Sequence, residues 1–142
     1  FADGLHPGQQ VLIENGTDRS DGRLSMALWR AVYAPGPGEA WAFGDASYAV
    51  FWDTRRLRGV NAPGGLSPDV VHDVWGSGPD NVYAVGFTSF PHPFGFGLRF
   101  DGAAWRLIDA GASREVTSVD GWSTNDVWIG TRGGGVLRAV TP

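Results

Sequence analysis

The chain has 142 residues, of which 42% are hydrophobic and 13% aromatic, enough for one domain with a substantial core. Its formal net charge is −4, and no basic cluster exceeds Arg55, Arg56 and Arg58, which argues against nucleic-acid binding. The absence of cysteine excludes disulfides and thiolate metal sites, and no apolar stretch approaches the roughly 20 residues of a membrane-spanning helix.

The beginning of the chain is predicted to be a single strand. Residues 11–16 (VLIENG) are similar to residues 107–111 (LIDAG), and FADG at 1–4 is similar to FDG at 100–102. Because the later segments close a repeat, residues 1–16 are expected to form the outer strand of a sheet. The polar residues 16–23 are predicted to be a connecting loop.

One short pattern occurs three times along the chain. VYAPGPGEAWAFG at 32–44 returns 42 residues later as VWGSGPDNVYAVG at 74–86, and VDGWSTNDVW at 119–128 follows 45 residues further on. Apolar runs separated by Gly, Pro and Asp turns, at a period of roughly 40 to 50 residues, are typical of a blade-type β repeat. The sequence therefore predicts an all-β, β-propeller-like fold.

Each copy is predicted to contain four short strands. In the second copy these are residues 70–75, 81–86, 97–101 and 104–109, all rich in Val, Tyr, Trp or Phe and bounded by turn residues. Residues 24–34 contain no helix breaker but align with a first strand, so a strand is predicted there. The single unit 1–142 then comprises an outer strand (1–16), two blades (24–61 and 70–111) and a blade that lacks its outer strand (115–140).

About three four-stranded blades are too few for a closed ring, since known propellers have typically about 4 to 8 blades. An open ring leaves unpaired edge strands. We therefore expect the ring to be completed by another chain, including copies of this one, or by the rest of a longer protein.

The repeats resemble those of known bacterial propellers. NDVWIGTRGGGVLR at 125–138 is similar to the repeat of two-component-regulator propellers, and residues 74–86 followed by FDGAAW at 100–105 resemble myxobacterial-type extracytoplasmic propeller repeats. The resemblance covers most of the chain and implies a bacterial protein, periplasmic or extracellular, with a role in sensing, adhesion or scaffolding. The matched residues have structural roles in the blade, so the resemblance does not indicate which ligand is bound.

Two sets of recurring residues are predicted to be structural. Trp41, Tyr83 and Trp128 occupy one repeat position, where large aromatic side chains would pack between neighbouring blades. Asp3, Asp53 and Asp101 precede a turn in each repeat and are expected to cap it.

The strongest candidate for a binding surface is the segment 87–97, which is longer than the corresponding segment of the other copies. Exposed phenylalanines are unfavourable, so its aromatic residues are expected to contact a partner or ligand, or else to pack on the segment itself. The candidate residues in this segment are Phe87, Phe90, His92, Phe94 and Phe96.

Tryptophans at two further positions are candidates for sugar stacking. Trp52 lies close to Arg55 and Arg56, and Trp122 stands at a position that Ser77 holds in the second copy. An exposed indole beside charged groups could stack on a sugar ring, and a solvated outer strand is the alternative for Trp52.

No pattern of catalytic or metal-binding residues is found in the sequence. His6, His72 and His92 have no zinc-type spacing, His72 and Asp73 are expected to be a structural pair, and no nucleophile–base pair is evident. We expect neither an enzyme nor a cofactor or metal. The predicted function is a non-enzymatic binding or assembly module that works through protein–protein contacts, and the alternative is a carbohydrate-binding lectin with shallow sites between blades.

Overall fold

The fold is described by a computed structural model for residues 13–14, 17–18, 29–44, 49–52, 57–59, 69–89, 92–108 and 115–139. Every regular element in these ranges is a β-strand, and all the strand pairs are antiparallel. The all-β prediction is therefore confirmed. The strands form one two-stranded hairpin and three larger sheets.

The three larger sheets are simple meanders, in which each strand pairs with the next along the chain. The first sheet contains β3 (Trp29–Gly36), β4 (Glu39–Gly44), β5 (Ala49–Trp52) and β6 (Leu57–Gly59). The second sheet contains β7 (Val70–Gly78), β8 (Asn81–Thr88), β9 (Phe94–Phe100) and β10 (Trp105–Ile108). The third sheet contains β11 (Val116–Ser123), β12 (Asp126–Thr131) and β13 (Val136–Ala139).

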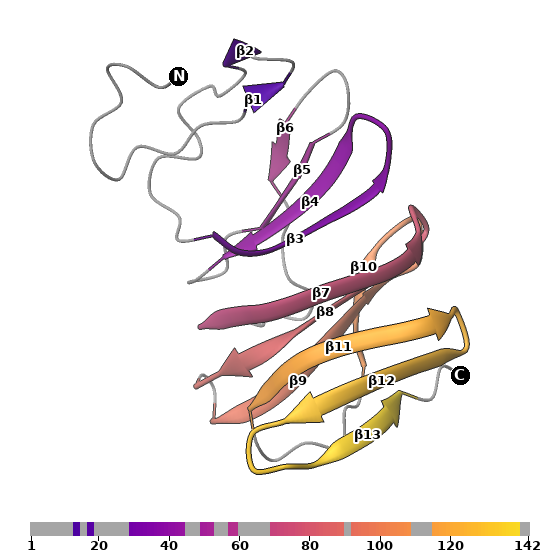
Figure 1. The fold of residues 1–142 in the computed structure, drawn as a ribbon. Coiled ribbons are helices and arrows are strands. Elements are labelled where there is room, and N and C mark those ends of the chain that lie inside the picture. Colours follow the sequence, from indigo (N-terminus) through magenta and orange to yellow (C-terminus); the bar gives the residue numbers. More distant parts are fainter. Residues whose placement is uncertain are drawn as a thin grey trace.

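The sheets are stacked in chain order, with the second between the other two (Figure 1). The first strand of each sheet lies nearest its counterparts, since β7 contacts both β3 and β11. In the part of the chain that the structure describes, no sheet closes on itself, and the first and third sheets form the two ends of the stack (Figure 1).

Two hydrophobic cores hold the stack together. The core between the first and second sheets contains Trp41, Phe43, Val71, Val74, Val82, Ala84, Phe96, Leu98 and Trp105. The core between the second and third sheets contains Tyr83, Val85, Val116, Val119, Val127 and Ile129. Side chains of a strand alternate between its two faces, so neighbours such as Val82 and Tyr83 serve different cores.

Burial along the strands reflects position in the stack. Residues 81–86 of β8 are buried without interruption, because this strand has a sheet on either side. In β12, Val127 and Ile129 are buried while Trp128 between them is exposed, because the third sheet is covered on one face.

The predicted strands of the second repeat are confirmed, with shifted ends. The first strand extends to Gly78, and the third begins at Phe94, three residues earlier than expected. The strand predicted over 24–34 is observed from Trp29 as β3, which continues to Gly36, and residues 24–28 lie outside the described ranges.

The prediction of a loop over residues 16–23 is wrong at Thr17–Asp18. These two residues form β2, which pairs with β1 (Ile13–Glu14). Their pairing, Ile13 with Asp18 and Glu14 with Thr17, is a contact that propensity alone did not indicate. This hairpin lies at the end of the stack opposite β13 (Figure 1), and the pairing of residues 1–16 with a larger sheet stays a prediction.

The turn between β9 and β10 is capped by Asp101, as predicted. Its Oδ1 accepts hydrogen bonds from the amides of Ala103 (3.0 Å) and Ala104 (2.9 Å). Gly102 adopts a positive φ of 92°, which a side chain would disfavour. Oδ2 is 2.8 Å from Nε of Arg106, and this bond, with the two amides, holds the pKa of the carboxyl well below its ordinary range. Asp3 and Asp53 lie outside the described residues.

We expect Asp101 to stabilise the fold more at neutral pH than in acid. A lowered folded pKa means that this contribution is complete above the ordinary value of 3.8 and is lost as the pH falls below it. Denaturant unfolding of the wild type and of Asp101→Asn between pH 2 and 7 should show an advantage for the wild type that shrinks in acid. An advantage that stays constant down to pH 2 would contradict this role.

Tyr83→Ala should lower the free energy of unfolding by about 3 to 5 kcal/mol, because Tyr83 is 0% exposed and fills the core between two sheets. Trp128→Ala is the matched control at the same repeat position and should cost about 1 kcal/mol or less, because 47% of this side chain is exposed. Chemical denaturation of the dilute protein measures both. Equal losses would show that the two positions are packed alike.

Candidate functional site

The third sheet has one uncovered face, which we call the outer face. It consists of the residues of β11, β12 and β13 that point away from the second sheet: Ser118, Asp120, Trp122, Asp126, Trp128, Val136 and Arg138. Trp122 is 91% exposed and Val136 67% exposed. Large apolar side chains exposed together on one surface mark an interaction site.

Asp126 connects the polar groups of the outer face. Its Oδ1 accepts a hydrogen bond from Nε1 of Trp128 at 3.0 Å and lies 3.1 Å from Nη2 of Arg138. The guanidinium of Arg138 lies over the Trp128 ring, 5.9 Å from its centre, within the range of a cation–π contact. These contacts fix the orientation of the Trp128 ring, so a partner would meet a preformed surface.

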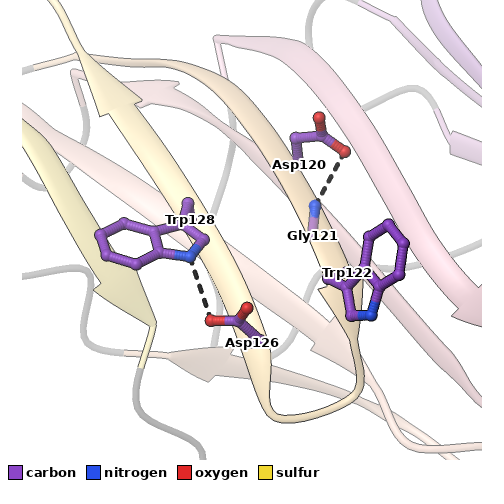
Figure 2. Close-up of a pocket in the computed structure, with 5 residues that line it drawn as sticks. All are labelled: Asp120, Gly121, Trp122, Asp126 and Trp128. Carbon is purple, nitrogen blue, oxygen red and sulfur yellow. Dashed lines mark hydrogen bonds between the residues drawn. The ribbon is translucent and has the colours of Figure 1, made fainter.

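A shallow hollow of about 330 Å³ lies between the two indoles. It is lined by Asp120, Gly121, Trp122, Asp126 and Trp128. Figure 2 shows the rings of Trp122 and Trp128 on neighbouring strands, with the carboxylate of Asp126 between them. Asp120 accepts a hydrogen bond from the amide of Gly121 at 2.8 Å, and this bond holds its side chain at the rim of the hollow.

The second sheet carries the same arrangement in buried form. Tyr83 stands at the position of Trp128, Asn81 at that of Asp126, and Arg99 at that of Arg138 on the third strand. Nε of Arg99 donates to Oδ1 of Asn81 at 3.0 Å, and its guanidinium lies 5.8 Å from the centre of the Tyr83 ring. Tyr83 and Asn81 are buried because the third sheet covers them. The outer face therefore has the chemistry of a sheet-to-sheet contact surface without a cover.

Trp128 does not fit the prediction that its position packs between blades. Trp41 and Tyr83 are buried against the following sheet, but Trp128 lies in the last sheet of the stack and is nearly half exposed. The physical reason is the absence of a following sheet in this chain's described residues.

The predicted aromatic segment 87–97 is mostly strand. β8 continues through Thr88 and β9 starts at Phe94, with Phe87 opposite Gly95 and Gly86 opposite Phe96. Phe96 is buried in the core between the first and second sheets, and Phe94 packs against that core. Phe94 and Phe96 therefore pack on their own domain, and contact of the rest of the segment with a partner or ligand stays a prediction.

The remaining predicted site residues are distributed widely. His92 is exposed, with its ring 5.6 Å from that of Phe94, and Phe87 is half-buried. Trp52 lies in β5, opposite Ala40 of β4 and Leu57 of β6. Phe90, Arg55 and Arg56 lie outside the described residues, so a sugar site that includes Trp52 stays a prediction.

Of the predicted site residues that the structure describes, Trp122 is the one on the outer face. Reasoning from the sequence missed Asp120, Asp126 and Arg138. The available signal was the 45-residue offset, which aligns Asp126 with Asn81 just as it aligns Trp128 with Tyr83. The position of Arg138 could not be aligned in the same way, because the loop before its strand differs in length from that before Arg99.

Among the described residues, a cluster of titratable side chains away from the outer face joins the second and third sheets. Glu115 contacts Nε2 of His72 through Oε1, and its Oε2 lies 2.6 Å from Nε of Arg132. Asp73 accepts hydrogen bonds from the amides of Val74 (2.9 Å) and Val119 (3.0 Å). His72 and Asp73 are therefore both engaged in contacts that hold structure together.

Within the described ranges, no group of three or more His, Cys, Asp or Glu side chains is placed to hold a metal ion. The same ranges contain no helix with the length and apolarity to cross a membrane.

Comparison with protein-family models, with curated proteins and with solved structures finds no match for this chain. Its function is therefore inferred from the outer face and from the repeat that explains it.

Proposed function

We propose that this chain is a β-propeller module that acts, without catalysis, as an extracytoplasmic binding or assembly element through protein–protein contacts. The observation that carries the proposal is the repeated arrangement of an aromatic ring, an arginine and an Asn or Asp side chain. This arrangement lies under a neighbouring sheet at Tyr83 and is uncovered at Trp128.

The propeller arrangement is supported by the stacking of the sheets. Repeats of four-stranded meanders whose first strands lie side by side are the building pattern of blades around an axis. The extracytoplasmic setting is supported by the resemblance of the repeats to bacterial extracytoplasmic propellers.

The edge of the third sheet supports the same function. In the first and second sheets the third strand pairs with a fourth, β6 or β10. Among the described residues, β13 has no such neighbour and presents an edge. Edge strands pair readily with strands of a partner, and charged side chains such as Arg138 limit pairing with unsuitable ones.

A protein partner fits the outer face because tryptophan and arginine are the residues that most often dominate protein interfaces. Trp122, Trp128 and Arg138 lie close enough to form one such cluster. The two carboxylates beside them would supply hydrogen-bond acceptors for a polar rim.

We expect the purified chain to associate reversibly beyond its 15.2 kDa monomer mass. Trp128→Ala and Arg138→Ala should each weaken association about tenfold or more, because they remove the centre of the outer face. Sedimentation velocity over a range of concentrations measures this, and Arg106→Ala, which removes an arginine ion pair from the second sheet, is the control. Association that is insensitive to the outer-face substitutions would contradict the proposal.

A lectin is the second candidate, favoured by the exposed indole of Trp122 beside the carboxylates of Asp120 and Asp126. Stacking on a sugar ring with hydrogen bonds to its hydroxyl groups would use these three side chains. Screening the chain on a glycan array and titrating any hit by calorimetry tests this function. Saturable binding that Trp122→Ala abolishes would establish the lectin, and no binding in the array would exclude it for the glycans tested.

A further inference from the structure

We propose that the outer face binds the first sheet of a second copy of this chain, in a head-to-tail contact. This inference rests on the proposed function and identifies its partner. It follows from comparing the two internal sheet-to-sheet contacts with the two faces at the ends of the stack.

The free face of the first sheet is the natural counterpart of the outer face. Val32 of β3 is 71% exposed, yet Val74 and Val119, at the same repeat position, are buried beneath the preceding sheet. Val32 therefore lies on a face that a preceding sheet would cover. Trp128 lies on a face that a following sheet would cover, so the two ends of one stack are the two halves of one contact.

Both internal contacts place an aromatic ring against a glycine. A Cβ atom added to Gly76 would lie 2.6 Å from the Tyr33 ring of the preceding sheet. A Cβ atom added to Gly121 would lie 2.7 Å from the Trp75 ring. Such distances are far inside van der Waals contact, so each ring requires a residue without a side chain beneath it.

The two end faces have neither the aromatic ring nor the glycine of this contact, and the residues that replace them fit each other. The ring position on the outer face is occupied by Asp120, which pairs with Trp128 as Trp75 pairs with Tyr83. The glycine position on the first sheet is occupied by Ala34, which is exposed. A methyl group would collide with a ring but leaves room for a carboxylate. The two faces are therefore complementary to each other where they differ from the internal contacts.

The turns between the first and second strands of each sheet give a second match. Ser77 Oγ of the second sheet lies 3.1 Å from Thr124 Oγ1 of the third. At the proposed contact, Trp122 of one copy stands at the repeat position of Ser77, and Pro37 of the next copy stands at that of Thr124. Both residues are exposed. An indole packed on a proline ring would bury the most exposed tryptophan of the outer face, which is 91% exposed in one copy.

A head-to-tail contact leaves each copy with one face of each kind, so association either closes into a ring or continues. Each copy contributes its first, second and third sheets. Two copies joined at both ends bring six sheets together, within the range of about 4 to 8 blades found in closed propellers. A discrete dimer is therefore expected instead of an open filament.

The first test asks whether both end faces are used. Sedimentation velocity of the purified chain should show a dimer of twice 15.2 kDa. Val32→Glu and Trp122→Ser should each weaken dimerisation about tenfold or more. The first places a charge in the contact, and the second removes the indole that packs on Pro37 of the other copy. Leu107→Glu is the matched control, because Leu107 is 52% exposed on the middle sheet and belongs to neither end face.

The second test uses the complementary pair. Asp120→Tyr should weaken dimerisation, because its ring would meet Ala34 of the other copy. Adding Ala34→Gly in the same chain should restore dimerisation, because the ring–glycine contact of the internal sheets is recreated. Circular dichroism of each variant at low concentration checks that the fold is kept, and a variant that loses its β signal is replaced by Asp120→Leu, with the same rescue expected.

The outcomes separate this inference from the proposed function. A chain that stays monomeric at all concentrations, or an Asp120→Tyr defect that Ala34→Gly does not rescue, overturns the copy-to-copy contact. If Trp122→Ser weakens association while Val32→Glu does not, the outer face binds another surface, and the inference fails while the proposed function stands.

Discussion

Packing of aromatic rings between successive sheets is the interaction on which the fold depends. The ring of Trp41 in the first sheet lies 4.9 Å from that of Phe100 and 5.2 Å from that of Trp105 in the second, the latter nearly perpendicular at 87°. Edge-to-face contacts of this kind add to the free energy of burying the rings. The chain contains no cysteine, so no disulfide adds to these packed cores.

Hydrogen bonds and ion pairs between the second and third sheets help to determine how these two sheets are aligned. Glu115 contacts both His72 and Arg132, and Asp73 accepts the amide of Val119. A hydrogen bond from one first strand to the next allows few alternative alignments, whereas a purely apolar contact tolerates sliding. The charged side chains thus contribute to the register of the stack more than to its total stability.

Most of the fold could be predicted from the sequence, because the repeat fixes the strand order and turn residues mark the ends of strands. Asp101 was recognisable as a turn cap for the same reason. The strand ends within segment 87–97 could not be predicted, because pairing such as Phe87 with Gly95 depends on the partner strand as well as on the residues themselves.

The candidate site was harder to predict than the fold. Trp128 and Tyr83 have equivalent positions and equivalent neighbours, and they differ in whether another sheet lies above them. Exposure at the end of a stack is a property of the assembly and is not encoded in the local pattern. Asp126 and Arg138 were missed because their role depends on a cross-strand arrangement, which a linear comparison of repeats does not reveal.

The two-sided burial of β8 has a consequence for the dynamics of the chain. In a stack where each sheet contacts its neighbours alone, opening an end sheet breaks one contact, whereas exposing β8 breaks two. The backbone amides of β8 should therefore exchange with solvent by near-global unfolding, and those of β12 by local fraying of the third sheet. The surface proposed to bind then lies on a sheet that opens more readily than the middle sheet on the timescale of hydrogen exchange.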